Sequence, residues 1–123
     1  MANAINWFEI PAANFERARK FYNTILAREL HVEEMQGIKM AMMMDENPSS
    51  VGGAICHGDM YKPSADGAVI YLNGGNDLDE PLARVEAAGG KVVLPKTQIS
   101  PEIGYMAYFM DTEGNRMAFH SPN

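Results

Sequence analysis

The 123-residue sequence contains a single cysteine, Cys56, and has no apolar run approaching the roughly 18 residues that a membrane-spanning helix needs. One cysteine excludes an intramolecular disulfide, and the opening segment MANAINWFEI has neither the basic nor the apolar part of a secretory signal. We therefore expect a cytoplasmic protein with no membrane partner. The formal net charge of −6 is scattered, so nucleic acid is not an expected partner either, because phosphate binding needs a concentrated Lys/Arg surface.

Methionine, in contrast, is abundant, with ten in the chain and four of them clustered at positions 40–44. Flexible thioethers fill irregular apolar space. The cluster is therefore expected in the core or in a subunit interface, and the wall of a ligand pocket is the alternative.

The first half of the chain changes its apolar period from that of a strand to that of a helix. Residues 5–10 are rich in β-formers and end at Pro11, which favours a first strand. From residue 15 onwards apolar residues recur at helical spacing behind Asn14, a good N-cap residue, which predicts a helix over residues 14–29. Three short strand-like runs follow, at residues 29–35, 38–45 and 51–56.

The second half repeats this order with an offset of about 62 residues, which indicates an internal duplication. A strand is predicted at 67–73, a helix at 76–90, and strands at 91–95, 104–110 and 115–120. The predicted fold class is α+β. It has two βαβββ repeats, about 4–60 and 66–122, within a single domain spanning residues 1–123. One helix covers one face of each repeat, so the other face must curl around a ligand, the sister half or a second chain.

This order resembles the vicinal oxygen chelate superfamily, with FEIPAANFERARKFY opening the first half and FMDTEGNRMAFH closing the second. The superfamily includes lactoylglutathione lyases, extradiol dioxygenases, fosfomycin-resistance enzymes and bleomycin-resistance proteins. The pieces WFEIP, YLN, VEAAGGKVVLPKT, DTEGNR and HSP are most similar to small single-domain glyoxalase-like proteins of bacteria. The resemblance implies a curled mixed sheet with a cup-shaped pocket and outer helices, and it implies a homodimer.

Metal-dependent members of this superfamily place His or Glu ligands on the first and fourth strands of each half. Here the corresponding positions hold Trp7 (Phe8 if the register slips), Ala54, Val69 (or its neighbour Ala68) and Ala118. None of these side chains binds metal ions, so we expect neither the usual metal site nor any other cofactor. The alternative is an unusual site built from Glu9, Cys56 or His57, and His120.

Strand alternation predicts which side chains line the cup. Phe8, Ile70, Phe109, Met117 and their alternating neighbours are assigned to the core, which leaves the opposite face to Trp7, Glu9, Tyr71, Asn73, Tyr108, Arg116 and His120. Glu9 is the candidate general base, unless it pairs with Arg116 or another donor, or lies in solvent at a sheet edge. His120 is a candidate acid or base, or orients Glu9, and the alternative is a hydrogen-bonded plug near solvent.

The remaining cup residues are candidate ligand-binding groups. Arg116 can bind a carboxylate or phosphate as a fork, although it follows a turn and is equally compatible with solvation. Trp7, Tyr71, Tyr108 and Asn73 would supply apolar surface and a few directed polar contacts.

These residues are compatible with three functions. We expect a small-molecule-binding protein that holds an apolar or aromatic ligand in its cup. The alternative is a lyase, isomerase or dioxygenase-like enzyme, similar to a lactoylglutathione lyase, that uses either Glu9 with His120 or a tyrosine, or an unusual metal site. A cup that mainly supports dimerisation is the third possibility.

Overall fold

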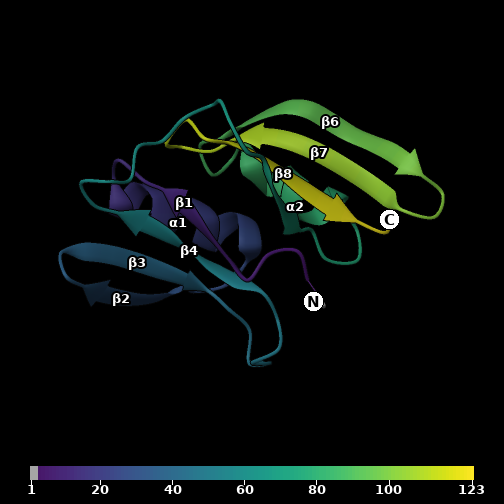
Figure 1. Ribbon diagram of the computed structural model, residues 1–123. Coiled ribbons are helices and arrows are strands. Elements are labelled where there is room, and N and C mark those ends of the chain that lie inside the picture. Colours follow the sequence, from purple (N-terminus) through teal and green to yellow (C-terminus); the bar gives the residue numbers. More distant parts are fainter. Residues whose placement is uncertain (1–2) are drawn as a thin grey trace.

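The computed structural model describes residues 3–123, so the first two residues of the predicted domain lie outside it. Each half runs strand, helix and three strands, as predicted (Figure 1). The first half comprises β1 (Trp7–Pro11), α1 (Phe15–Leu26), β2 (His31–Met35), β3 (Ile38–Met43) and β4 (Gly52–His57). The second comprises β5 (Ile70–Asn73), α2 (Asp79–Val85), β6 (Lys91–Ser100), β7 (Gly104–Met110) and β8 (Arg116–Ser121).

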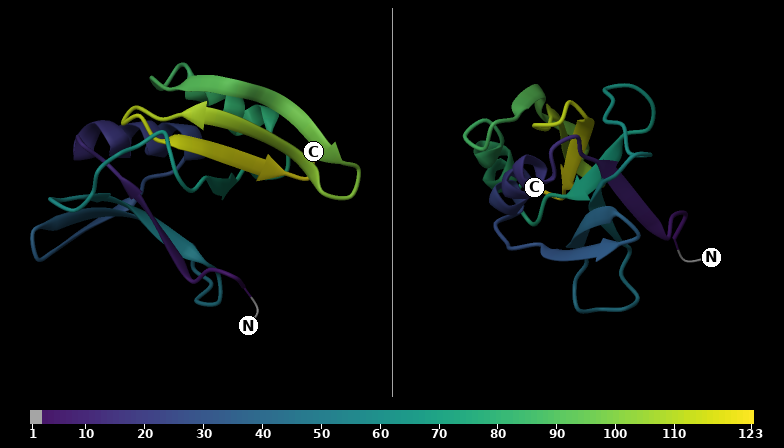
Figure 2. Two further views of the ribbon diagram at one scale, coloured as in Figure 1. Left: turned by 45° about the horizontal axis from the view of Figure 1, so that its top comes forward. Right: turned by 90° about the vertical axis from the view of Figure 1, so that its left-hand side faces the viewer.

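The strands form two four-stranded mixed sheets with the same internal order, β1-β4-β3-β2 and β5-β8-β7-β6. In each sheet the first and fourth strands of the half are parallel, and the other pairs are antiparallel. Figure 2 shows the two sheets as separate layers. The predicted α+β fold with two βαβββ units is confirmed.

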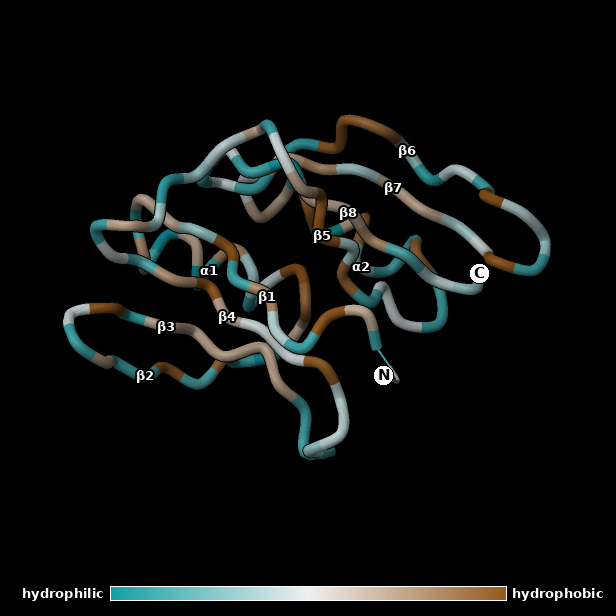
Figure 3. Tube along the Cα trace, in the orientation of Figure 1, coloured by the Kyte–Doolittle hydropathy of each residue, from teal (hydrophilic) through white to brown (hydrophobic). Residues whose placement is uncertain are grey.

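A single hydrophobic core joins the helix-facing sides of both sheets. Ile10 and Ile55 of the first sheet share this core with Phe109 and Phe119 of the second. The helices also contact each other, since the Arg84 side chain on α2 donates from Nε to the Ile25 carbonyl on α1 at 3.2 Å. Figure 3 shows, in contrast, that hydrophilic residues gather at the tip of the loop between β3 and β4.

Helix α1 begins as predicted but ends earlier than residue 29. The Asn14 side chain accepts a hydrogen bond from the Arg17 backbone N–H, which satisfies one of the free donors of the first turn. At the other end Ala27 adopts a left-handed conformation, with φ of 54°, and its N–H bonds back to carbonyls of the last turn. This C-terminal cap stops the helix at Leu26, because a left-handed residue cannot continue a right-handed helix.

Strand β6 passes the point at which the sequence predicted its end. The sequence predicts a strand over residues 91–95, yet β6 continues past Pro95 to Ser100. Proline is tolerated here because β6 is an edge strand, paired with β7 alone, and the pairing register shifts between Leu94 and Thr97. The predicted strand at 67–73 is shorter than expected, so Ala68 and Val69 precede β5.

A buried carboxylate fixes the two halves to each other. Asp111, 5% exposed, accepts a hydrogen bond from the Tyr22 hydroxyl of α1 at 2.6 Å and another from the Asn115 amide at 2.9 Å. The same amide donates to the Pro11 carbonyl at the end of β1 at 2.8 Å, and its oxygen accepts from the Ser64 N–H. Burial, followed by the Asp111 charge, raises the pKa of Tyr22 well above its usual value. This joint sets the position of the second sheet relative to β1.

The methionine cluster divides between the interior and the surface. Met43 belongs to the main core, and Met40 is 8% exposed in a smaller cluster on the other side of the first sheet. Met44, at 47% exposed, is the only large hydrophobic residue of the cluster that lies at the surface of the described chain. None of the helices described in residues 3–123 is long and apolar enough to cross a membrane.

Candidate ligand-binding site

Each sheet has one face covered by the shared core and one that is not. We call the uncovered side of the first sheet the tryptophan face: Trp7, Glu9, Met40, Met42, Ala54 and Cys56. We call the uncovered side of the second sheet the tyrosine face: Tyr71, Met106, Tyr108, Arg116, Ala118 and His120. The alternation of strand side chains thus places all the predicted cup residues on strands β1, β5, β7 and β8 opposite the core.

Glu9 lies on the tryptophan face with two hydrogen-bond donors beside it. The Trp7 indole Nε1 donates to one carboxylate oxygen at 3.2 Å, and the Tyr61 hydroxyl donates to the other at 2.8 Å. Tyr61 was missed by the sequence analysis, because it lies on the loop after β4 and strand alternation says nothing about loop residues. Its hydrogen bond to Glu9, with burial as a second cause, raises the pKa of Tyr61 to about 12.

The thiol of Cys56, on the tryptophan face, is in an environment that keeps it unreactive. Cys56 is fully buried, and burial first, then the negative charge of Glu9, raises the pKa of its thiol to about 12. A thiol with so high a pKa holds almost no thiolate at neutral pH. The adjacent His57 points elsewhere, its Nδ1 lying 2.8 Å from the Ala12 carbonyl oxygen. The pair therefore does not form a thiolate–imidazole nucleophile.

The tyrosine face is built around a pair of phenols. The hydroxyls of Tyr71 and Tyr108 are hydrogen-bonded at 2.8 Å, and their rings meet edge to face with centroids 6.0 Å apart. Ala118 pairs with both tyrosines in the strand register and is fully buried beneath them. The bond to Tyr108, with burial as a second cause, raises the pKa of Tyr71, although the nearby charge of Arg116 acts in the opposite direction.

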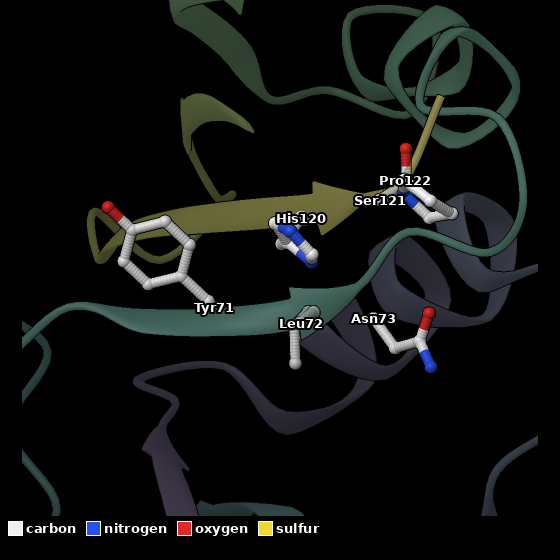
Figure 4. A pocket seen from close by; sticks show the side chains of 6 residues that line it. All are labelled: Tyr71, Leu72, Asn73, His120, Ser121 and Pro122. Carbon is white, nitrogen blue, oxygen red and sulfur yellow. The ribbon is translucent and has the colours of Figure 1, made fainter. Parts of the chain in front are cut away.

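Asn73 and His120 border a broad pocket of about 570 Å³ next to this pair (Figure 4). The His120 Nε2 donates to the Ile103 carbonyl at 2.7 Å, since a carbonyl oxygen only accepts. The Asn73 side chain accepts from the Gly75 N–H at 2.8 Å and so stabilises the turn before α2. His120 is thus engaged on the second sheet, away from Glu9 on the first, and catalytic roles for these two residues stay predictions.

Residues of the two faces come together around one pocket. A pocket of about 220 Å³ lies under the linker between β4 and β5, and both Glu9 and Arg116 line it. No ion pair joins these two side chains within the described residues, so the pairing of Glu9 with Arg116, one of the alternatives above, is not formed. This pocket is where the structure brings predicted residues of both sheets together.

The residues at the superfamily's ligand positions do not suit a metal ion. Trp7, Ala54 and Ala118 lie on strands of the two sheets, Val69 directly precedes β5, and none of the four side chains carries an atom that can ligate a cation. Among residues 3–123, no group of three or more His, Cys, Asp and Glu side chains converges in a way that could hold a metal. The alternative set of Glu9, Cys56 or His57, and His120 is divided between two sheets. The expectation of a cofactor-free protein stays a prediction.

Comparisons with known proteins agree with this architecture. No protein-family model matches the chain. A glyoxylase-like domain-containing protein from Didymella fabae is 29% identical over 118 residues, covering 93% of this chain and 90% of the relative.

Among solved structures, an antibiotic binding protein from Streptomyces is similar with a TM-score of 0.66, 21% identity, and coverage of 100% of this chain and 99% of that one. A glyoxalase/bleomycin resistance protein from Albidiferax ferrireducens is similar with a TM-score of 0.68, 16% identity, and coverage of 95% and 97%.

Paired βαβββ units with one uncovered face each define a class of cup-forming α+β proteins. The chain shares its fold with solved glyoxalase-related structures and is similar in sequence to a glyoxylase-like domain-containing protein, and both findings support the predicted resemblance to the vicinal oxygen chelate superfamily.

Proposed function

We propose that this protein binds an apolar or aromatic small molecule without converting it, using the uncovered faces of its sheets. The observation that carries this proposal is the composition of the tryptophan face, where an indole and two thioethers surround a single carboxylate. Ligand pockets typically combine such apolar surface with a few directed polar groups. The similarity to an antibiotic binding protein supports the same role.

Trp7 provides the test, because it is the chain's only tryptophan and its emission reports on this face alone. We expect flat aromatic compounds, with neutral 4-nitrobenzamide as the reference probe, to quench Trp7 emission saturably and to raise the melting temperature. Free N-acetyltryptophanamide under the same conditions is the control for collisional quenching. A panel that gives only collisional quenching and no thermal shift would contradict the proposal.

The enzyme alternative rests on the hydrogen bonds that hold the Glu9 carboxylate in place. A general base must lie within hydrogen-bond reach of the proton that it removes, and the oriented, exposed carboxylate satisfies this for a ligand on the tryptophan face. Mass spectrometry of each bound compound after incubation distinguishes the two functions. Conversion that is lost in Glu9→Gln, with binding retained, would favour the enzyme.

We also propose that the protein acts as a cytoplasmic single domain and forms a homodimer. Edge strand β2 supports the dimer, because among the described residues it pairs with β3 alone and its Met35 side chain is 59% exposed. Light scattering should give twice the mass of one chain at micromolar concentration, and a monomer would count against the proposal.

A further inference from the structure

The pocket between the two sheets is lined by Arg116, which differs from the other arginines in having no hydrogen-bond acceptor among the described residues. Four of the five arginines have acceptors: Arg17 and Arg19 pair with carboxylates, and Arg28 and Arg84 donate to backbone carbonyls. Arg116 has no acceptor within the described residues, and its Nε is buried. A buried donor without a partner costs about 1–3 kcal/mol, so native proteins seldom leave one.

Arg19 offers an instructive contrast. Its Nε is also buried without a partner, but its two terminal nitrogens pair with Glu16 and Glu29 at 3.4 and 3.2 Å. The Arg19 charge is therefore compensated, whereas none of the five N–H donors of Arg116 has an acceptor in residues 3–123. A guanidinium that lines a pocket and lacks a hydrogen-bond acceptor is suited to an acceptor from outside the chain.

The surroundings of Arg116 form a defined pocket. Arg116 lines the 220 Å³ pocket together with Glu9, Lys62, Ser64, Asp66 and Asn115. The Asn115 side chain is buried and bonded to β1, to the linker and to Asp111, so this wall is held from three directions. One wall of the pocket is therefore held in place by hydrogen bonds, and two cationic side chains, Arg116 and Lys62, also line it.

We propose that this pocket binds a carboxylate group of the ligand, with Arg116 as the principal contact and Lys62 as a weaker one. This inference rests on the proposed function, and it narrows the ligand class to aromatic or apolar carboxylic acids. Their rings would lie against the tryptophan face, to which Glu9 connects the pocket.

The charge of the pocket favours a monoanion over a phosphate. Two cationic side chains, Arg116 and Lys62, are balanced by two acidic ones, Glu9 and Asp66. A dianion would meet stronger repulsion from the two acids than a monoanion meets, and a planar carboxylate matches the guanidinium fork with two parallel hydrogen bonds. The formal net charge of −6 on the whole chain also makes a local cation necessary for any anionic ligand.

The test compares 4-nitrobenzoate with 4-nitrobenzamide, a neutral probe of nearly the same shape, by calorimetry and Trp7 quenching. Wild-type protein should bind the acid roughly 10- to 100-fold more tightly than the amide, as expected for hydrogen bonds to a charged group. Arg116→Gln should remove this preference by weakening the acid far more than the amide. Arg19→Gln, which removes the same charge at a distant site, should retain the preference.

Several results would overturn the inference while leaving the proposed function intact. Equal affinities for acid and amide would do so, as would a preference that survives Arg116→Gln. Displacement of 4-nitrobenzoate by excess inorganic phosphate would overturn the choice of a carboxylate. If neither probe binds, the proposed function fails as well. Arg116→Lys, which keeps the charge but loses the fork, should retain part of the preference, and melting temperatures verify that each variant folds.

Discussion

The tryptophan and tyrosine faces occupy equivalent positions in two halves with the same strand order, yet they differ in chemistry. In the strand register, Glu9, Ala54 and Met42 of the first sheet correspond to Tyr71, Ala118 and Tyr108 of the second. The alanine at the centre is the same, while the side chains that cover it differ. One face offers thioethers and an oriented carboxylate, and the other offers a pair of phenols beside an arginine. The same strand order therefore carries a mainly apolar face in the first sheet, the tryptophan face, and a more polar one in the second, the tyrosine face.

The largest expected effect, on the free energy of unfolding, comes from removing the buried Asp111 carboxylate, whose hydrogen bonds hold the two halves together. Asp111→Ala leaves the Tyr22 hydroxyl and the Asn115 amide without their buried acceptor. We expect the free energy of unfolding, measured in urea, to fall by about 3 kcal/mol or more. The control Asp45→Ala removes an exposed carboxylate that accepts one backbone N–H and should cost less than about 1 kcal/mol. Equal costs for the two variants would contradict the structural role of Asp111.

Thiol reactivity compares the two faces at one equivalent position, which Cys56 occupies on β4 and His120 occupies on β8. With its pKa raised to about 12, Cys56 should react with iodoacetamide at pH 8 roughly 1,000-fold more slowly than a free thiol. Glu9→Gln removes a negative charge that raises this pKa, so it should speed the reaction. The matched variant His120→Cys, made in a Cys56→Ser background, places a thiol on the less buried tyrosine face and should react faster. Rapid labelling of native Cys56 would contradict the burial of its thiol.

Ligand affinities of variants on each face test whether the tryptophan face or the tyrosine face supplies most of the binding energy. Trp7→Ala removes the largest apolar contact of the tryptophan face and should weaken 4-nitrobenzamide binding about 30-fold, as for a buried aromatic hot spot. Tyr108→Phe removes only one hydroxyl from the tyrosine face and should change affinity less than about threefold. Calorimetry measures both variants. The reverse order would assign the neutral ligand to the tyrosine face.

The smallest effect concerns an ion pair between α1 and the turn that leads into the tyrosine face. Burial alone would raise the pKa of Glu113, but hydrogen bonds from Arg17, the Asn14 N–H and Thr112 outweigh it and lower the pKa. A lowered pKa contributes stability above the unfolded value of about 4.3, and this contribution is lost as the pH falls through the folded value. The melting temperature should therefore decline below about pH 4, and Glu113→Gln should decline less steeply. An identical pH profile for both proteins would count against the pair.

Local sequence patterns predicted the elements and their facing residues well. Alternation around Phe8, Ile10 and Phe109 placed the core correctly, because a strand has only two faces. Element ends were less predictable, since the left-handed Ala27 and the edge position of Pro95 depend on tertiary structure. The contact between Tyr61 and Glu9 spans a loop, which no periodicity describes. The isolation of Arg116 was not predictable either, because it depends on the absence of acceptors from distant segments.

Methyl NMR of the methionines tests the central claim, that an aromatic ligand lies against the tryptophan face. Met40 and Met42 lie on this face, whereas Met43 on the same strand points to the opposite side, into the shared core, and serves as an internal control. On titration with 4-nitrobenzamide, we expect the Met40 and Met42 signals to shift saturably while that of Met43 stays in place. A bound ligand that leaves Met40 and Met42 unshifted, or that shifts Met43 most, would contradict the account.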